Sequence, residues 1–310
     1  QGLFRQLDEL LDATTVLASN TSSLSITAIA SVCKHPERVA GLHFFNPVPL
    51  MRLVEVIGGI ATRPDVIEQL QTLVKRVGHY PAISKDSPGF IVNHAGRAFG
   101  TEALRILSEG VAPMALIDAV LRDGAGFRMG PFELLDLTGL DVSLPVMESV
   151  YRQFYEEPRY RPHPLLSLMQ AGGHLGRKSG QGFYKYEGKG AAPRRVQPVP
   201  PCPQLPFVWV AGDDDIGRTR LLALLEHLGA KVERGPRPSA DALCVLTTLG
   251  EDATESALRH GVDPARTVAI DTLLELDNLR CLMLNPATRA DMQSAAHALF
   301  SKDGGTVVVI

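Results

Sequence analysis

The sequence predicts three domains in order along its 310 residues: an α/β domain, an all-α domain and a second α/β domain. Short β-prone runs alternate with amphipathic helices over residues 1–86, and apolar helical runs follow one another over residues 87–186. The alternation returns over residues 206–310, after a proline-rich linker at 187–205. Because alternating strands and helices favour a parallel sheet, we expect an α/β layer architecture in both the first and the last domain.

The first domain is expected to begin with an amphipathic helix, followed by a strand that ends at Ser19. A hydroxyl cap at Thr62 and an early proline at Pro64 predict the start of a later helix, and Gly78 predicts its end. The other elements expected here are a short helix over 24–32 and strands over 39–45, 53–57 and 80–84.

The second domain is expected to be helical, and the third is expected to return to strands. The helical runs occupy residues 90–107, 114–121, 132–137 and 142–154. In the third domain we expect a helix over 219–228 and strands over 207–212, 243–247, 267–270 and 282–284.

Composition and charge exclude several classes of protein. With 45% hydrophobic and 21% charged residues, the chain is typical of soluble globular proteins. Its net charge of −3 gives no electrostatic reason to expect nucleic acid or a membrane as partner. The sequence also lacks an apolar run near the roughly 18 residues of a membrane span and the pattern of a signal peptide. We therefore expect a cytoplasmic protein.

The four cysteines are far apart in the sequence and lack the spacing of a metal site. They are Cys33, Cys202, Cys244 and Cys281. Thiols in cytosolic proteins are usually reduced. We therefore expect neither disulfides nor a bound metal.

A histidine and a glutamate form the strongest candidate for a catalytic site. His43 and Glu55 are twelve residues apart, each inside a run predicted to be a strand. An imidazole that takes a proton near neutral pH works best when a carboxylate holds its tautomer and stabilises the imidazolium. The alternative is a core histidine with a satisfied partner. The neighbouring motifs that contain Ser22 and Asn93 favour the catalytic interpretation.

Four separated motifs carry a resemblance to a known family. They read Ser-Asn-Thr-Ser-Ser-Leu at 19–24, Gly-Leu-His-Phe-Phe-Asn-Pro at 41–47, Ser-Pro-Gly-Phe-Ile-Val-Asn at 87–93 and Gly-Arg-Lys-Ser-Gly-Gln-Gly-Phe-Tyr at 176–184. A further stretch, 126–136, reads Gly-Phe-Arg-Met-Gly-Pro-Phe-Glu-Leu-Leu-Asp. In these motifs the sequence resembles the 3-hydroxyacyl-CoA dehydrogenases, particularly the long 3-hydroxybutyryl-CoA dehydrogenase-like variants associated with phenylacetate degradation.

The resemblance implies a partial Rossmann-type domain, a helical domain that binds substrate and forms a homodimer through residues 87–186, and then a degenerate Rossmann-like repeat. It implies that the chain is truncated at both ends, and that the NAD-binding glycine loop lies outside it, so the fragment as given is expected to bind NAD poorly. The expected activity is NAD-dependent oxidation of (3S)-3-hydroxyacyl-CoA to 3-oxoacyl-CoA in β-oxidation-type fatty acid metabolism. A competing interpretation is a non-catalytic structural or assembly protein derived from this family.

The resemblance also implies roles for single residues. His43 is the expected general base and Glu55 the carboxylate that orients it, while Ser22 and Asn93 hold the substrate. Residues expected to reach the cofactor are Asn20, Ser22, Asn46 and Lys178.

Several of these residues have simpler interpretations. Ser22 could cap a helix, Asn46 before a proline could start a turn, and Lys178 could be a solvated loop charge. Asn93 is favoured as functional because an amide inside an apolar run needs partners. His94 replaces an arginine that is usual in the family, which puts any nearby salt bridge in doubt.

The third domain is expected to be an inert repeat of the first. Thr62-Arg63 and Asp65 return as Thr288-Arg289 and Asp291 at an offset of 226 residues. In the predicted alignment His43 lies opposite Leu282, Ser22 and Ser23 lie opposite Leu273 and Leu274, and Asn46-Pro47 lies opposite Asn285-Pro286. Glu55 has no counterpart, because residues 48–60 are missing from the second copy.

The dinucleotide turn of the repeat is also altered. A Rossmann fingerprint needs three glycines so that the backbone can approach a pyrophosphate. The sequence here reads Gly-Asp-Asp-Asp-Ile-Gly over residues 212–217. We therefore expect this domain to serve packing or assembly and to have no second NAD site.

Overall fold

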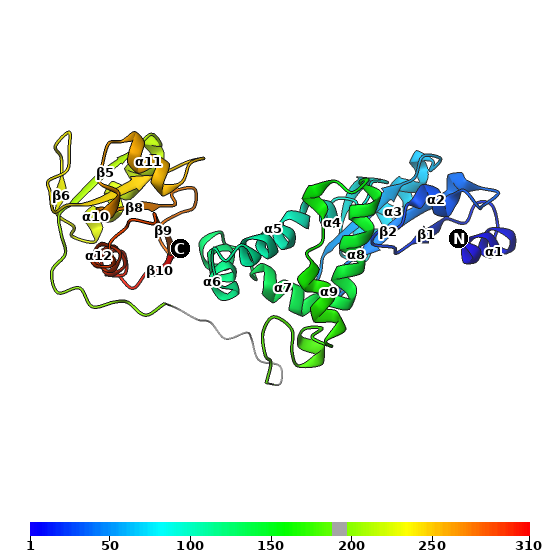
Figure 1. Cartoon of the computed structure of the whole chain (residues 1–310). Helices are drawn as coiled ribbons and strands as arrows, with labels where there is room; N and C mark the ends of the chain where they lie inside the picture. The colour runs from blue at the N-terminus through cyan, green and yellow to red at the C-terminus, as the bar shows by residue number, and fades with distance from the viewer. Residues whose placement is uncertain (188–196) are drawn as a thin grey trace. The chain divides into compact units, whose positions relative to one another are not determined.

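A computed structural model describes residues 1–187 and 197–310 (Figure 1). The chain divides into two compact units. The first unit comprises residues 1–104 and 138–182, and the second comprises residues 105–137 and 183–310. Part of the predicted linker, residues 188–196, lies outside the described residues.

The first unit contains a four-stranded sheet in the order β1-β2-β3-β4. Strand β1 (Leu17–Ser19) is parallel to β2 (Val39–Phe44), and β3 (Leu53–Gly58) is parallel to β4 (Tyr80–Lys85). Between them, β2 and β3 are antiparallel, with His43 directly opposite Glu55. The register of this one pair therefore aligns the two residues of the predicted dyad.

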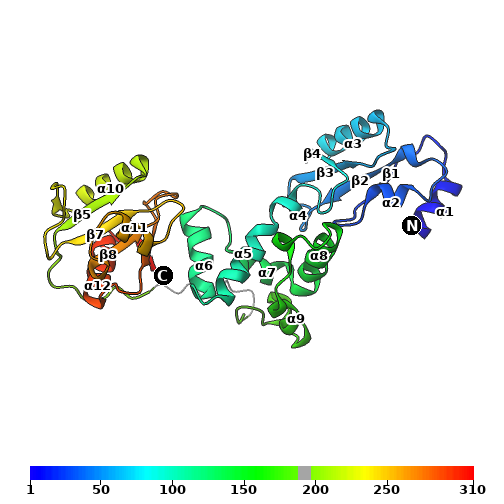
Figure 2. The ribbon, with the colours of Figure 1, turned by 45° about the horizontal axis from the view of Figure 1, so that its top comes forward.

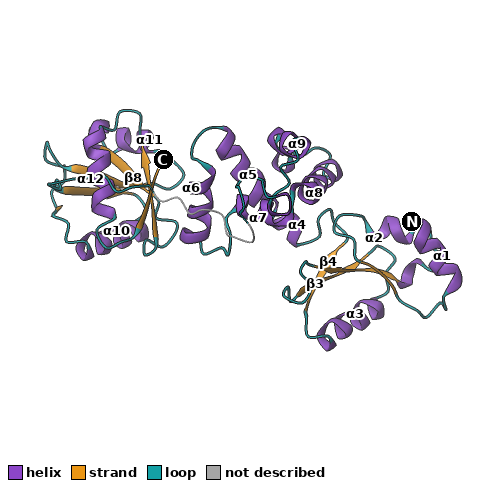
Figure 3. Cartoon of the chain, turned by 90° about the horizontal axis from the view of Figure 1, so that it is seen from below, coloured by secondary structure: helices purple, strands orange, loops and turns teal. Residues whose placement is uncertain are grey.

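Helices cover both faces of this sheet (Figures 2 and 3). Helix α3 (Pro64–Arg76) packs on one face, where its buried residues recur every four positions, at Val66, Leu70 and Val74. The other face is covered by α2 (Ile26–Ala30) and α1 (Gly2–Leu10). Because both faces are covered, the strands are predominantly apolar, as in other buried sheets.

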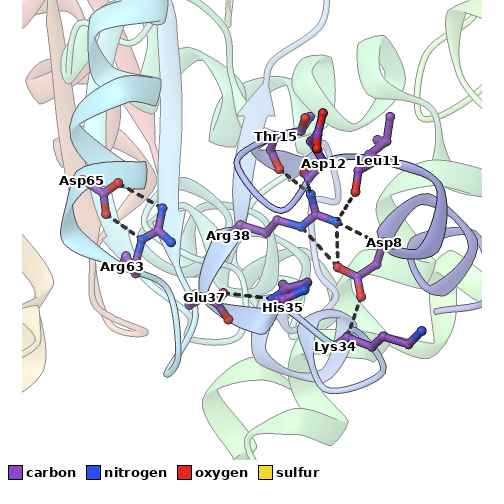
Figure 4. Close-up of polar contacts among 10 residues, drawn as sticks. All are labelled: Asp8, Leu11, Asp12, Thr15, Lys34, His35, Glu37, Arg38, Arg63 and Asp65. Carbon is purple, nitrogen blue, oxygen red and sulfur yellow. Dashed lines mark hydrogen bonds and ion pairs between the residues drawn. The ribbon is translucent and has the colours of Figure 1, made fainter.

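A buried arginine ties α1 to the sheet (Figure 4). Arg38 ends the short 3-10 helix η1 (Pro36–Arg38) and is fully buried. Its Nη2 lies 2.8 Å from a carboxylate oxygen of Asp8. The Arg38 guanidinium also donates, through Nη1 and Nη2, to the backbone carbonyls of residues 8, 11, 12 and 15. Burial raises the pKa of Asp8, but hydrogen bonds from Arg38 and from the Lys34 amide hold that pKa below its usual value. The buried charge is thus fully compensated.

The start of α3 is confirmed, but its predicted cap is wrong. Thr62 does not cap the helix, because its hydroxyl donates to the Val39 carbonyl at 2.6 Å and accepts from the Gly59 amide at 2.8 Å. Arg63 occupies the N-cap position, and Pro64 opens the helix as predicted. Gly78 follows the helix with φ of +83°, which explains the glycine at its end.

The secondary structure of residues 87–187 is helical apart from one isolated bridge between Gly176 and Gln181. The single helix predicted over 90–107 is wrong, because the structure divides it into α4 (Val92–Ala95) and α5 (Arg97–Ser108) at Gly96. The first unit also contains α8 (Leu140–Gln153), η3 (Pro158–Tyr160), α9 (Pro164–Ala171) and η4 (Arg177–Ser179).

Two buried carboxylates brace the helical part of the second unit. That part contains α6 (Met114–Ala119), the π-helical turn η2 (Val120–Gly124) and α7 (Pro131–Thr138). Asp118 accepts hydrogen bonds from the backbone at the start of α7 and from the Tyr184 hydroxyl. Asp136 accepts from the amides of Phe183 and Tyr184 and from the Tyr186 hydroxyl. The motif at 126–136 and the segment 183–186 are therefore linked within the second unit.

The second sheet has six strands in the order β10-β9-β8-β7-β5-β6. Helices α10 (Asp215–His227) and α12 (Ala290–Phe300) pack on one face, and α11 (Ala253–Arg259) packs on the other (Figure 1). The strands are β5 (Val208–Gly212), β6 (Val232–Glu233), β7 (Leu243–Thr247), β8 (Thr267–Ile270), β9 (Leu279–Leu284) and β10 (Thr306–Val309). All neighbouring strands are parallel except β8 and β9.

The topology corrects the predicted alignment of the two sheets. Strand β2 follows η1, lies parallel to β1 and is antiparallel to β3. Strand β8 follows η5 (Pro264–Arg266), lies parallel to β7 and is antiparallel to β9. Thus β2 is equivalent to β8 and β3 to β9, whereas the sequence alignment matched β2 with β9. It was misled by two Asn-Pro pairs, at 46–47 and 285–286, that follow strands which are not equivalent.

In the described parts of the chain, none of the helices has the length and apolar character needed to span a membrane.

Candidate active site

His43 and Glu55 form a buried hydrogen-bonded pair in the first unit. The Nδ1 atom of His43 lies 2.7 Å from Oε2 of Glu55. Glu55 is fully buried and His43 is 5% exposed. Because an ionised carboxylate can only accept, the bond places a proton on Nδ1 and leaves Nε2 as the basic atom of the neutral ring. The pair has the geometry expected for an oriented general base.

The second oxygen of Glu55 fixes the carboxylate in place. Its Oε1 accepts hydrogen bonds from the amides of Ile91 and Val92, both at 2.9 Å. Glu55 therefore connects the antiparallel strands to the start of α4. Since both oxygens are engaged, the carboxylate cannot rotate without breaking several bonds.

An unusual backbone turn presents these two amides to Glu55. Gly89 and Phe90 both have positive φ, at +77° and +51°. A non-glycine residue in this conformation costs about 1–3 kcal/mol and is most common at functional sites. Phe90 is buried, and its ring centroid lies 6.0 Å from that of His43. The turn explains the Pro-Gly-Phe sequence of this motif.

The loop that carries Ser22 is held by two amide side chains. Asn93 donates through Nδ2 to the Ser22 carbonyl at 3.3 Å. Gln153, at the end of α8, donates to the Ser23 carbonyl at 2.9 Å and is itself held by the Ser149 hydroxyl. The structure thus brings Ser22 and Asn93 together, as predicted.

Ser22 is not the helix cap that its sequence context allowed. Ser25 caps α2, and its hydroxyl accepts from the Ala28 amide. Asp86, which follows β4, accepts from the Ile26 and Thr27 amides at 2.8 and 2.7 Å. Ser22 is therefore not the residue that caps α2.

Asn20, Asn46 and Lys178 lie in different surroundings. Asn20 accepts a hydrogen bond from the Phe44 amide at 2.9 Å, beside His43 in the chain. Asn46 is exposed and precedes Pro47 through a cis peptide bond. Lys178 forms an ion pair with Asp141. The structure places Asn20 near the dyad and gives Lys178 a partner in α8.

Sequence reasoning missed Asp86 and Gln153. Asp86 carries a local signal, because an aspartate that ends a strand just before a Ser-Pro-Gly turn is a good partner for a helix N-terminus. Gln153 carries no such signal, because it lies 130 positions after Ser23, whose carbonyl it binds.

The equivalent positions of the second unit lack this chemistry. In the corrected alignment, Asp271 is equivalent to His43, where Leu282 was predicted. Cys281 is equivalent to Glu55, for which no counterpart was predicted. Leu249 is equivalent to Ser22, where Leu273 was predicted. Burial, followed by the nearby Asp271 charge, raises the pKa of the Cys281 thiol to about 12. A thiol of this kind cannot orient a base as Glu55 does.

The dinucleotide turn of the second unit is occupied by its own carboxylate. Asp214 lies at the N-cap of α10 and accepts from the Thr272 hydroxyl at 3.1 Å. The Gly217 amide, the largest influence, lowers the pKa of Asp214 and keeps it charged. A pyrophosphate would need this same helix N-terminus.

The fold agrees with the comparisons to known proteins. Residues 1–87 match the model of the 3-hydroxyacyl-CoA dehydrogenase NAD binding domain, and residues 89–186 match that of the 3-hydroxyacyl-CoA dehydrogenase C-terminal domain. The chain therefore belongs to the 3-hydroxyacyl-CoA dehydrogenase family.

Particular relatives make this more specific. The chain is 52% identical over 186 residues to 3-hydroxyadipyl-CoA dehydrogenase of Escherichia coli K12, a match that covers 60% of this chain and 39% of that protein. It is 44% identical over 185 residues to human mitochondrial hydroxyacyl-coenzyme A dehydrogenase, which covers 60% of this chain and 59% of that protein. The chain thus spans less than two thirds of the length of these relatives.

A solved structure resembles the whole chain. The crystal structure of 3-hydroxybutyryl-CoA dehydrogenase from Escherichia coli K12 matches with a TM-score of 0.78 and 36% identity. This match covers 100% of the present chain and 60% of the other. The likeness therefore extends through the second α/β unit.

Proposed function

We propose that this protein oxidises (3S)-3-hydroxyacyl-CoA to 3-oxoacyl-CoA with NAD, using His43 as general base. The buried bond between His43 Nδ1 and Glu55 Oε2 carries the proposal, because it orients Nε2 to receive a proton. The three relatives described above are named as dehydrogenases of hydroxyacyl-CoA substrates. The alternative of a non-catalytic assembly protein is not favoured by these matches.

The proton leaves the C3 hydroxyl of the substrate and bonds to Nε2 of His43. Glu55 stabilises the imidazolium that forms, while Ser22 and Asn93 hold the reacting oxygen in line with the ring. When bound, NAD supplies the acceptor for the hydride that leaves C3, so that the alcohol becomes a ketone. The burial of the dyad keeps water from competing for its hydrogen bonds.

The residues at the carboxyl end of β1 are chemically suited to a dinucleotide. Asn20 and Ser22 follow this strand and offer an amide and a hydroxyl, which carry no negative charge toward a diphosphate. In the second unit, Asp213 and Asp214 follow β5, which is not the strand equivalent to β1, and their carboxylates do not fit a diphosphate. We assign Asn20, Ser22, Asn46 and Lys178 as the candidate contacts of NAD in the first unit.

The proposed substrates have short acyl chains. The relatives are named for a butyryl chain and for an adipyl chain, which ends in a free carboxylate. Adipyl-type chains fit a role in phenylacetate degradation, which is part of this proposal. A cytoplasmic location is proposed too, because all four cysteines are unpaired thiols.

The proposed partner of the chain is a second copy. Helices within residues 87–186 expose large apolar side chains, which a homodimer interface would cover. These side chains are Ile106, Val111, Phe127, Leu134, Leu137, Val142 and Leu168.

A His43→Gln variant tests the proposed activity. Glutamine can keep a bond to Glu55 but cannot accept the substrate proton. We expect kcat to fall by about 10²–10⁴-fold on a saturating 3-hydroxyacyl-CoA, the usual contribution of general-base catalysis. His35→Gln is the matched control, since His35 is partly exposed and pairs with Glu37 at the surface. Near-full turnover in His43→Gln would remove this residue from the mechanism.

A further inference from the structure

Arg97 is a partly buried cation that has no counter-ion among the described residues. Its Nε and Nη1 atoms are buried and have no hydrogen-bond partner in the described parts of the chain. Burial lowers the pKa of Arg97. Leaving an ionised group buried and unpaired is costly, so proteins normally supply a partner.

The two fully buried arginines show that this fold normally compensates its buried guanidinium groups. Arg38 is bonded to Asp8 and to several carbonyls. Arg280 donates to both oxygens of Asp303 and to the Leu276 carbonyl. Arg97 is the exception to this pattern in the part of the chain that the structure describes. A buried guanidinium without an anionic partner therefore indicates a binding site for an anionic ligand.

Arg97 lies one helical turn beyond a residue of the candidate active site. Gly96 joins α4 to α5 in a right-handed helical conformation, so Arg97 is about 5–6 Å from Asn93 at the level of the Cβ atoms. Asn93 in turn contacts the Ser22 carbonyl. Arg97 therefore lies on the same helical segment as a residue that is proposed to hold the substrate.

The same helical stripe packs against an aromatic cluster. His94 lies 3.2 Å from the Tyr160 hydroxyl, and its ring contacts Phe154 edge-on. Further along, Thr101 donates to the Arg159 carbonyl. Since His94, Arg97 and Thr101 are spaced three and four residues apart, Arg97 lies on the face that η3 covers. A buried cation on a helical segment that packs against aromatic side chains suits a ligand with an apolar chain and one terminal anion.

We propose that Arg97 binds the terminal carboxylate of the acyl chain and so selects 3-hydroxydicarboxylyl-CoA substrates such as 3-hydroxyadipyl-CoA. This inference rests on the proposed function. In 3-hydroxyadipyl-CoA, the carboxylate is three carbon–carbon bonds from the carbon that is oxidised, which suits a residue one helical turn from Asn93. The guanidinium can pair with both carboxylate oxygens, which adds geometric selectivity to charge.

The test compares two six-carbon substrates that differ only in the terminal group. The substrates are 3-hydroxyadipyl-CoA and 3-hydroxyhexanoyl-CoA, and kcat/KM is measured for the full chain and for Arg97→Met. We expect Arg97→Met to lose about 10- to 100-fold on the adipyl substrate, in line with hydrogen bonds to charged groups, and to keep its activity on the hexanoyl substrate. Arg105→Met, on the same helix, is the control and should leave the ratio unchanged.

Two outcomes would overturn the inference. An equal loss on both substrates would assign Arg97 to the CoA phosphates or to folding, because both substrates share the CoA. An unchanged ratio would remove Arg97 from recognition. If Arg97→Met does not fold, Arg97→Lys provides the test, since it keeps the charge but loses the planar fork and should lower the adipyl preference.

Measurements of thermal stability and of ligand binding distinguish a failure of this inference from a failure of the proposed function. A specificity residue held unpaired should leave the melting temperature of Arg97→Met equal or higher, whereas a structural arginine would lower it. Calorimetric Kd values for adipyl-CoA and hexanoyl-CoA test Arg97 even if the full chain oxidises neither substrate. A chain that turns over neither substrate but shows the Arg97-dependent Kd ratio would contradict the proposed function alone.

Discussion

At the scale of single residues, Glu55 has three hydrogen-bond partners that together determine the state of His43. One oxygen accepts from His43, and the other accepts from the amides of Ile91 and Val92. The residue types of this dyad could be read from the sequence, since a histidine and a glutamate in adjacent predicted strands suggest a pair. The two amides could not, because they depend on the left-handed conformation of Phe90.

Glu55→Gln should reduce catalysis while preserving the fold. A glutamine can still accept from one of the backbone amides, but its NH₂ group then meets His43 and favours the tautomer protonated on Nε2. We expect kcat to fall by about 10²–10⁴-fold, because a ring protonated on Nε2 cannot act as the base. The measurement is kcat at saturating substrate, with the imidazole tautomer followed by ¹⁵N NMR. A variant with normal turnover and an Nε2-protonated ring would contradict this assignment.

At the scale of elements, the buried carboxylate of Asp118 connects α6, α7 and the segment that contains Tyr184. In the sequence, residues 126–136 could be recognised only as a family motif, and the contacts of these residues could not be predicted. In the structure a Cβ at Gly130 would overlap Asp118, which explains why the smallest residue stands there. The break between α4 and α5 at Gly96 was likewise not predicted from the sequence.

The stability of this brace should depend on pH. Burial, the largest influence, raises the pKa of Asp118 from 3.8 to about 6, despite hydrogen bonds from Tyr184 and the α7 backbone. The folded state therefore binds the proton more tightly than the unfolded state, and this contribution is lost as the pH rises from about 4 through about 6. The expected loss is at most about 3 kcal/mol, since one pKa unit corresponds to about 1.4 kcal/mol.

The comparison that isolates this contribution is between the native chain and Asp118→Asn. The free energy of unfolding in urea should fall more steeply between pH 4 and 7 in the native chain than in the variant. Parallel pH profiles for the two proteins would show that Asp118 does not titrate in this range.

At the scale of the whole molecule, the two α/β sheets share a local plan but differ at the positions that matter for chemistry. The equivalent strand pairs β2/β3 and β8/β9 keep the same antiparallel register. Their Thr62 and Thr288 hydroxyls donate to equivalent carbonyls at 2.6 and 2.8 Å. The second sheet therefore preserves the framework and not the dyad.

Self-association is the prediction at this scale. If the exposed apolar side chains of residues 87–186 form an interface, light scattering at tens of micromolar protein should give the mass of a dimer. Leu168→Lys would place a charge on the exposed face of α9 and should shift the equilibrium toward monomer, while Leu258→Lys, at an exposed position of α11, should not. A monomer mass for the native chain would contradict the proposal, as would an interface located on residues 206–310.

The sequence by itself determined the order of α/β and helical segments and the family, and it singled out His43, Glu55, Ser22 and Asn93 as candidate site residues. These follow from local periodicity and from motifs of adjacent residues. Only the tertiary structure decided that Asp271 and Cys281 stand where the dyad stands in the first sheet and that Gln153 holds the Ser23 carbonyl. It also decided that Arg97 has no counter-ion within residues 1–187 and 197–310. The physical reason is that strand register and the compensation of buried charge depend on groups far apart in the chain, which only packing brings together.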